Sequence, residues 1–239
     1  MEKDILVQPR WNFKDVLLSL AVVFAGSYGA GSLILFFIAP DIDLAGRYLV
    51  AGTIQAILFL GTVLLIIFIK YGGGLHQLGL SRSLSSDKLE KGIIGGVVLF
   101  IIVLVTGAFV SVLMPIEPKP QPFAELLLNA DSPFEILVPF FIGGILAPLG
   151  EEVYFRGFTY PVFKQRFGAL WGIGFSAVFF ALLHFDPIRF LPLALGGAGL
   201  AWLYEKTGSL FVPIIAHSIW NTGMLGLLLI TSRLQGTFF

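Results

Sequence analysis

The sequence contains no cysteine and little charge. Its 239 residues include 15 Lys and Arg, 15 Asp and Glu, and a formal net charge of zero. The missing cysteines exclude disulfide bonds, thiolate metal sites and a cysteine nucleophile. There is no basic run of the kind that follows a phosphate backbone, so we expect no nucleic-acid partner.

Apolar residues make up more than half of the sequence. The chain is 56% hydrophobic and 13% charged, whereas a soluble domain carries about 25% charge, and its mean hydropathy is 0.91. Runs at about 16–38, 49–69 and 93–114 reach the roughly 20 helical residues that cross a bilayer. The first is longer than the apolar region of a secretory signal. We therefore predict an integral membrane protein that retains this span and has the lipid bilayer as a partner.

The second half of the sequence begins with a helix start signal. Ser132, Pro133 and Glu135 form a capping box, with Pro at the first helical position. We expect this helix to start near Pro133, pass through the charged cluster described below, and be disturbed at Pro161. The segments before it, 71–91 and 115–132, are predicted to be exposed loops.

Shorter apolar runs at about 169–184, 188–204 and 210–230 complete the pattern. The predicted fold is an all-α polytopic membrane bundle of about seven transmembrane helices, with an eighth left open, around an intramembrane polar cavity. We expect a single membrane domain over residues 1–239. Residues 1–132 form its three N-terminal spans and their loops, and residues 133–230 form the helices that carry the three motifs described below.

The distribution of Lys and Arg predicts an orientation, because positive residues accumulate on the cytoplasmic side. With the N-terminus inside, seven spans leave four basic residues outside, namely Arg47, Lys119, Arg189 and Arg233. The other 11 are inside, namely Lys3, Arg10, Lys14, Lys70, Arg82, Lys88, Lys91, Arg156, Lys164, Arg166 and Lys206. We predict a cytoplasmic N-terminus and an active site open to the cytoplasmic side.

The most unusual segment is Glu151-Glu152-Val153-Tyr154-Phe155-Arg156. Charges this close to a bilayer core are costly unless they face a protein interior or water, so they indicate a functional site. Glu152 and Arg156 are four residues apart and lie on one helical face, a spacing that most often marks a structural ion pair. Glu151 lies about 100° around the helix, which leaves its carboxylate free to act as a base.

Two other pairs have the same spacing, Phe180 with His184 and His217 with Asn221. Taken singly, each histidine could be a helix-to-helix hydrogen-bonding residue, and Asn221 could serve only to hold helices together. Taken together, they provide polar partners for Glu151.

Depth estimates at 1.5 Å per residue place Glu151, His217 and Asn221 at overlapping levels. His184 is harder to place. It comes out roughly 24 Å from a helix start near Gly168, too deep unless that helix starts later or tilts.

Such residues favour peptide hydrolysis by an activated water, with a carboxylate as base and imidazole and amide groups as oxyanion donors. A zinc ion held by Glu151, His184 and His217 is a second interpretation, although no H-E-x-x-H motif is present. Ser176, in Gly174-Phe175-Ser176-Ala177, faintly resembles the nucleophile turn of rhomboid proteases. That interpretation gives the charged cluster no role.

Three motifs in order, Glu151-Glu152-x-x-x-Arg156, Phe180-x-x-x-His184 and His217-x-x-x-Asn221, resemble those of a known family. It is the type II CAAX prenyl endopeptidase and bacteriocin-processing (CPBP, Abi) family of intramembrane proteases, and the resemblance covers about residues 134–225. It implies a helical membrane fold with a water-filled cavity and a glutamate-dependent mechanism without a catalytic metal.

The resemblance also implies a role for each motif residue. Glu151 would activate water, His184 would hold that water, and His217 and Asn221 would form the oxyanion hole. Glu152, Arg156 and Phe180 would support the site. No cofactor is expected, with zinc kept as an alternative.

The predicted function is therefore an intramembrane endopeptidase that acts on a peptide or a prenylated protein, such as a CAAX-type C-terminal tail. An alternative from another class is a non-hydrolytic peptide-binding or immunity protein on the same fold. A transporter would also use buried Glu and His, but the span pattern shows no inverted repeat. The sequence sets neither the substrate nor the oligomeric state.

Overall fold

A computed structural model describes residues 8–37, 41–80, 83–114 and 122–236, and these residues contain helices and no strand. Five helical stretches within them are long and apolar enough to cross a membrane, namely Phe13–Ile34, Leu44–Lys70, Ser86–Leu113, Pro133–Leu182 and Phe211–Leu234. The chain is thus an all-helical, multi-pass integral membrane protein, as predicted.

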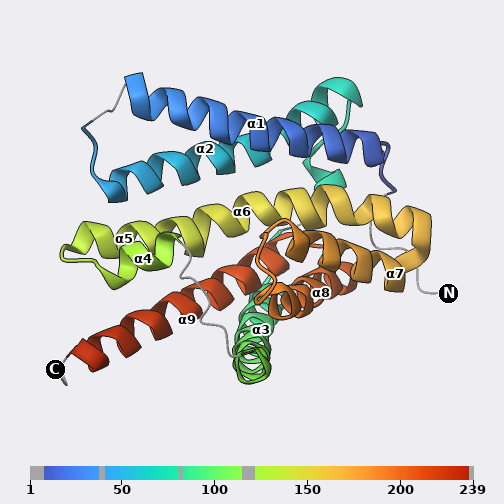
Figure 1. The fold of residues 1–239 in the computed structure, drawn as a ribbon. Coiled ribbons are helices and arrows are strands. Elements are labelled where there is room, and N and C mark those ends of the chain that lie inside the picture. Colours follow the sequence, from blue (N-terminus) through green and yellow to red (C-terminus); the bar gives the residue numbers. More distant parts are fainter. Residues whose placement is uncertain (1–7, 38–40, 81–82, 115–121, 237–239) are drawn as a thin grey trace.

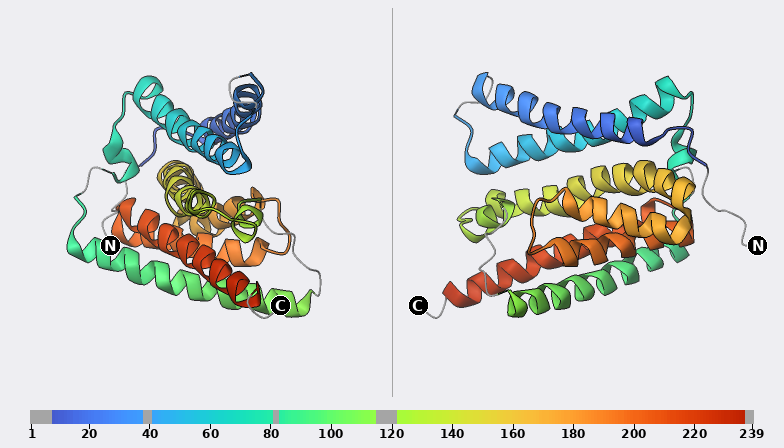
Figure 2. Two further views of the ribbon diagram at one scale, coloured as in Figure 1. Left: turned by 90° about the vertical axis from the view of Figure 1, so that its left-hand side faces the viewer. Right: turned by 45° about the vertical axis from the view of Figure 1, so that its right-hand side comes forward.

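The helices form layers around one long central element (Figure 1). The antiparallel helices α1 (Phe13–Phe37) and α2 (Leu44–Leu65) lie on one side of it. Helices α3 (Ser86–Leu113), α8 (Phe190–Thr207) and α9 (Phe211–Gly236) lie on the other, as Figure 2 shows from two further directions. The site residues on the central element can therefore meet side chains from both layers.

The central element is helical from Pro133 and contains two π-helical segments. It comprises α5 (Pro133–Phe141), η3 (Ile142–Leu146), α6 (Ala147–Glu152), η4 (Val153–Thr159) and α7 (Tyr160–Leu182), of which η3 and η4 are π-helical. The predicted capping box is confirmed, because Ser132 and Glu135 each accept from the other's backbone N–H. π-Helical turns are rare and often occur at functional sites, and here they lie on both sides of Glu151 and Glu152.

The prediction that Pro161 disturbs this helix is wrong. In the turn before it, Tyr160 N–H donates to Phe155 O in the i→i−5 pattern, and this wider turn gives the proline ring room. The helix instead reverses at Gly168, whose backbone has φ 78° and ψ 171°, values that suit glycine. With α7 divided at this point, seven long helices within the described residues correspond to the seven predicted apolar runs.

Both predicted exposed loops contain structure. In the first, a 3₁₀ helix, η2 (Leu75–Leu78), buries Leu78, and α3 already begins at Ser86 behind a Ser85 cap. His76 is exposed, as a loop histidine should be. In the second, helix α4 (Pro122–Leu128) buries Leu126 and Leu127, while residues 115–121 lie outside the described residues. Pattern reading failed here because a single helical turn buries too few residues to show a period.

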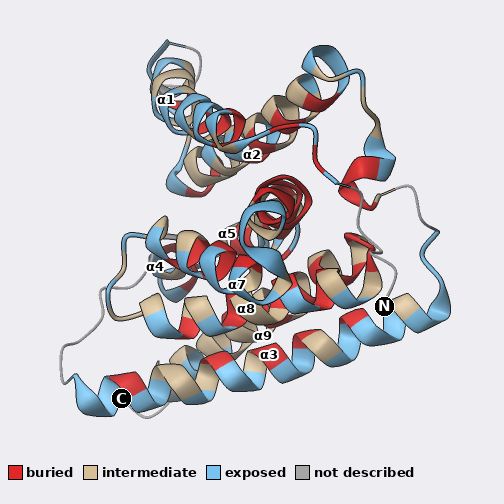
Figure 3. Ribbon diagram, turned by 90° about the vertical axis from the view of Figure 1, so that its right-hand side faces the viewer, coloured by how far each residue is buried: buried red, intermediate tan, exposed pale blue. Residues whose placement is uncertain are grey.

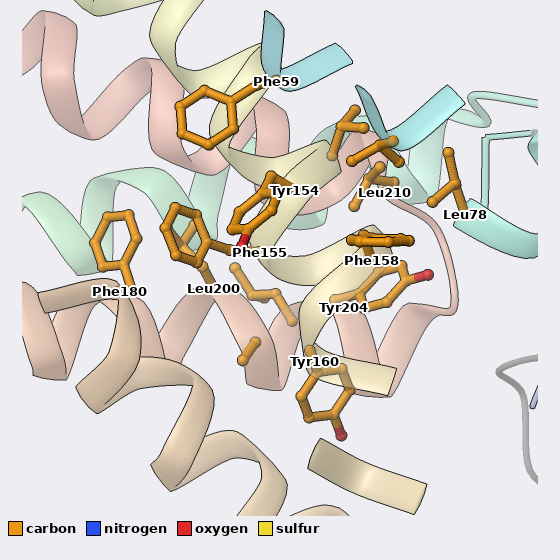
Figure 4. Close-up of a cluster of buried hydrophobic side chains, with 14 of the residues drawn as sticks. Phe59, Leu78, Tyr154, Phe155, Phe158, Tyr160, Phe180, Leu200, Tyr204 and Leu210 are labelled. Carbon is orange, nitrogen blue, oxygen red and sulfur yellow. The ribbon is translucent and has the colours of Figure 1, made fainter. Parts of the chain in front are cut away.

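Buried side chains concentrate on the central element, while outer helices such as α3 keep exposed apolar faces (Figure 3). Exposed apolar faces are what a bilayer requires. The core around η4 is rich in aromatic rings, and the rings of Phe155 and Phe180 meet edge to face at 5.0 Å (Figure 4). This core fixes the end of α7 against the segment that carries the charged cluster.

Candidate active site

One cavity of about 560 Å³ brings the four predicted catalytic residues together. Glu151 reaches it from α6, His184 from the turn after α7, and His217 and Asn221 from α9. Residues separated by up to 70 positions in sequence therefore share one lining. Their predicted roles remain predictions, but their proximity is a property of the fold.

Glu152 and Arg156 form the ion pair expected from their spacing. Arg156 Nη1 donates to Glu152 Oε1 at 2.7 Å, and both side chains are completely buried. Arg156 Nη2 also donates to the backbone oxygen of Gly197 in α8 at 3.0 Å. The bond to Gly197 links the pair to α8, whereas Glu152 Oε2 and Arg156 Nε are buried without a hydrogen-bond partner among the described residues.

His217 joins the two glutamates, which the sequence analysis did not foresee. Its Nδ1 lies 2.8 Å from Glu152 Oε1, and its Nε2 lies 4.0 Å from Glu151 Oε2. Because an ionised carboxylate only accepts hydrogen bonds, Nδ1 must carry a proton. The other ring nitrogen, Nε2, then faces the carboxylate of Glu151.

Oppositely charged side chains surround His217. Glu151 and Glu152 are acidic and Arg156 is basic, and all three lie within one cluster with the imidazole. When His217 carries a proton on Nε2, that N–H is a hydrogen-bond donor at the cavity wall.

His184 reaches the site because the chain reverses later than expected. It lies two residues beyond the end of α7 at Leu182. Since the central helix continues to Gly168 rather than Pro161, Glu151 and His184 both lie roughly 24 Å from the reversal at 1.5 Å per residue. The apparent depth mismatch therefore came from placing the end of the central helix seven residues too early.

His184 Nδ1 lies 2.9 Å from the backbone oxygen of Phe180, so this nitrogen is the donor of the bond. In the neutral tautomer that has this proton, Nε2 is an acceptor that can take a hydrogen bond from water. The ring of Phe180 lies 4.7 Å from that of His184 and 6.0 Å from that of His217. Phe180 thus packs beside both imidazoles, and its supporting role stays a prediction.

Asn221 has a structural partner in addition to its place at the cavity. Its Nδ2 donates at 2.8 Å to the backbone oxygen of Gly143 in η3. In the i→i−5 pattern of η3, the residue facing that oxygen is Pro148, which has no N–H to donate. Asn221 therefore replaces the missing donor, and its amide has a second N–H for a substrate.

Several residues of the site were not singled out from the sequence. Gly197 and Gly143 contribute backbone oxygens, Trp220 stacks on His217 with ring centres 5.1 Å apart, and Arg189 lines the cavity. Backbone acceptors leave no trace in a pattern of side chains.

The structure also bears on the serine and zinc interpretations of the site. Ser176 is completely buried and is absent from the cavity lining, so nothing here favours it as a nucleophile. For zinc, the described residues include no group of three His, Asp or Glu side chains placed to hold a metal ion. A zinc site would need these side chains to rearrange.

Fold and site together define a helical membrane protein with a carboxylate and imidazole site inside its bundle. Residues 133–223 match the family described as type II CAAX prenyl endopeptidase Rce1-like, which is a family of membrane endopeptidases. The matched segment is less than half of the chain, and it contains all three motifs.

A curated relative supports the same assignment. The chain is 30% identical over 81 residues to the putative membrane peptidase YdiL of Bacillus subtilis, an alignment that covers 34% of this chain and 33% of the relative. The chain thus spans about one third of the length of that protein. No solved structure matches the chain significantly.

Proposed function

We propose that the chain is an intramembrane endopeptidase that hydrolyses a peptide bond with a water activated by Glu151. The observation that carries the proposal is the shared cavity, where a carboxylate that is 21% exposed faces an imidazole held by a second, buried carboxylate. The family of residues 133–223 supports peptide substrates, including prenylated CAAX tails.

In the proposed reaction, Glu151 takes a proton from water while His184 Nε2 accepts the water's other hydrogen bond. The water oxygen attacks the scissile carbonyl. Nε2–H of His217 and the second amide N–H of Asn221 donate to the resulting oxyanion, and Glu151 returns the proton to the leaving amine. No covalent intermediate is required, and each proton is accounted for.

The test uses purified protein in liposomes with prenylated CAAX peptides and a library of membrane peptides. We expect cleavage by the wild type and a loss of at least about 10²-fold for Glu151→Gln, the scale of general acid and base catalysis. Glu90→Gln, the same change at an exposed position on α3, is the matched control. Full activity of Glu151→Gln would refute the mechanism, and loss with a chelator followed by rescue with zinc would favour a metal.

A cellular assay of site and packing variants addresses the non-hydrolytic alternative. A binding or immunity protein would retain its cellular effect in Glu151→Ala and His184→Ala, because neither change alters helix packing. It would lose that effect in Gly196→Leu, since a Cβ at Gly196 already lies 2.5 Å from the Trp220 ring. Loss of the cellular effect in Glu151→Ala and His184→Ala supports the enzyme.

A further inference from the structure

Helix α2 carries a glutamine, Gln55, in the middle of a long apolar stretch. Between Arg47 and Lys70 the sequence has no charged residue. At 1.5 Å per residue, Gln55 lies roughly 12 Å from Arg47 and roughly 22 Å from Lys70 along the helix. A side-chain amide at this depth in a membrane is costly unless it meets a polar partner. The partner of Gln55 is therefore a functional question.

Gln55 lies on the face of α2 that packs against the central element. Gly52 and Ala56 flank it on this face. A Cβ at Gly52 would lie 2.8 Å from Ile142 Cγ2, and a Cβ at Gly150 would lie 3.4 Å from Ala56 Cα. Gln55 is nevertheless exposed, and it lines the main cavity. Its amide is therefore accessible to whatever fills that cavity.

Gln55 also lies near the proposed base. A second, small cavity of about 10 Å³ separates α2 from α6, and both Gln55 and Glu151 line it. This volume is about that of a single water molecule. The same two residues line the main cavity as well. A peptide bond presented to Glu151 would therefore pass close to the amide of Gln55.

A simple explanation is that Gln55 holds α2 against a neighbouring helix, as polar residues in membrane helices often do. Thr62 on the same helix behaves in this way. Its hydroxyl group lies 2.7 Å from Ser19 Oγ and donates to the backbone oxygen of Leu58 at 2.7 Å. The Gln55 side chain, by contrast, makes no hydrogen bond within the part of the chain that the structure describes. Holding helices together does not explain its amide.

We propose that Gln55 binds the main chain of the substrate beside the scissile bond. This inference rests on the proposed peptidase function and adds a positioning residue to it. A side-chain amide has an acceptor oxygen and two N–H donors, so it can pair with the N–H and the C=O of a peptide unit. A peptide inside a membrane has no water to satisfy these groups once its own helix is opened for cleavage. Gln55 supplies the missing partner.

The proposed contact selects a conformation rather than a sequence. The lining of the cavity beside Gln55 includes Phe24, Phe59 and Val103, whose side chains cannot form hydrogen bonds with a main chain. Recognition by an amide does not depend on the side chains of the substrate, but it requires a main-chain N–H. The selected class is therefore an extended peptide segment without proline at the contacted position.

The test uses purified protein in liposomes and peptides of one sequence. Each peptide has one amide within three residues of the scissile bond replaced by an ester, which removes a single N–H. At one position we expect KM of the wild type to rise about threefold to tenfold, the range for one neutral hydrogen bond. Gln55→Met should raise KM of the all-amide peptide by a similar factor with kcat nearly unchanged, because the bond is present before and during the reaction. The ester at that position should then cause no further loss.

Two further variants serve as controls. Gln55→Asn keeps an amide on a shorter side chain and should recover part of the affinity. Ile57→Met changes a residue of α2 that is 61% exposed and lines neither cavity, so it should respond to every ester as the wild type does. Gln55→Met should melt no lower than the wild type, because it removes an amide from an apolar helix.

Three results would overturn the inference. The first is a response to every ester in Gln55→Met that equals the response of the wild type. The second is a fall in kcat of Gln55→Met at unchanged KM, which would assign the amide to the attacking water. The third is a lowered melting temperature with an equal loss on all peptides, which would indicate a structural role.

Binding measurements separate this inference from the proposed function. The Glu151→Gln variant should bind the all-amide peptide about threefold to tenfold more tightly than the ester that weakens cleavage most. The double variant Glu151→Gln with Gln55→Met should bind both equally. If no peptide is cleaved, the proposed function fails, while a difference in binding across the ester series would still support Gln55. Cleavage with an ester pattern that Gln55→Met leaves unchanged refutes only the role of Gln55.

Discussion

Nδ1 of His217 lies 2.8 Å from Oε1 of Glu152, the same oxygen that accepts from Arg156 Nη1 at 2.7 Å. The two neighbouring glutamates are therefore used differently. Glu152 is a buried anchor that orients His217 and balances Arg156. Glu151 is partly exposed and faces the cavity with its carboxylate.

This division predicts opposite consequences for the same substitution at adjacent positions. Glu152→Gln leaves Arg156 buried without a counter-charge, so we expect a loss of about 3–5 kcal/mol in stability. Glu151→Gln should change the melting temperature little while abolishing cleavage. Thermal melts in detergent, run beside the peptide assay, measure both effects. Equal melting temperatures for the two variants would contradict the assignment.

A second prediction concerns the oxyanion hole. Asn221→Asp keeps the size of the side chain but removes both amide N–H groups. We expect kcat to fall by about 10²–10³-fold, the cost of removing one oxyanion donor. KM should change less, because the bond is strongest in the transition state. Asn129→Asp, at an exposed position on the turn after α4, should leave kcat unchanged.

Much of this site could be predicted because it consists of side chains at recognisable sequence spacings. The pairing of Glu152 with Arg156 and the capping box at Ser132 follow from fixed helical spacing, and the structure contains both. The long apolar runs likewise predict an all-helical membrane protein, since a bilayer admits few other architectures.

The remaining features could not be predicted because they depend on backbone geometry and on contacts distant in sequence. The π-helical turns and the reversal at Gly168 decide which residues share a depth. The sequence placed a helix start near Gly168 but ended the preceding helix at Pro161. The bond between His217 and Glu152 spans 65 residues. Arg156 was counted among the cytoplasmic charges, yet it is completely buried and contributes nothing to a loop.

Close approach at Gly197 gives a third prediction. A Cβ there would lie 3.1 Å from Phe180 Cδ1 and 3.3 Å from Arg156 Nη2. Gly197→Ala should therefore push α8 away from the site and destabilise the protein by about 1–3 kcal/mol, with reduced cleavage. Gly61→Ala on α2 is the matched control, since no atom lies within 4 Å of a Cβ at that position. It should stabilise by about 0.5–1 kcal/mol, and a similar loss in both variants would refute the packing argument.

The last prediction concerns the side of the membrane to which the cavity leads. Lining residues such as Ser111, Ala124 and Arg189 belong to the end of α3, to α4 and to the start of α8, which lie toward one end of the bundle (Figure 2). Lys88, near the start of α3, and Lys164, near the reversal at Gly168, belong to the opposite end. If that basic end is cytoplasmic, the cavity extends toward the outer side, so the side to which the active site opens stays a prediction.

Because the chain has no cysteine, single substitutions report sidedness without background. We expect a membrane-impermeant maleimide to label Asn129→Cys in intact cells, since this exposed residue lies at the cavity end of the bundle. Ser83→Cys, exposed just before α3 at the basic end, should react only after lysis. The reverse pattern would place the cavity end in the cytoplasm and show that the charge bias misassigns the orientation of this chain.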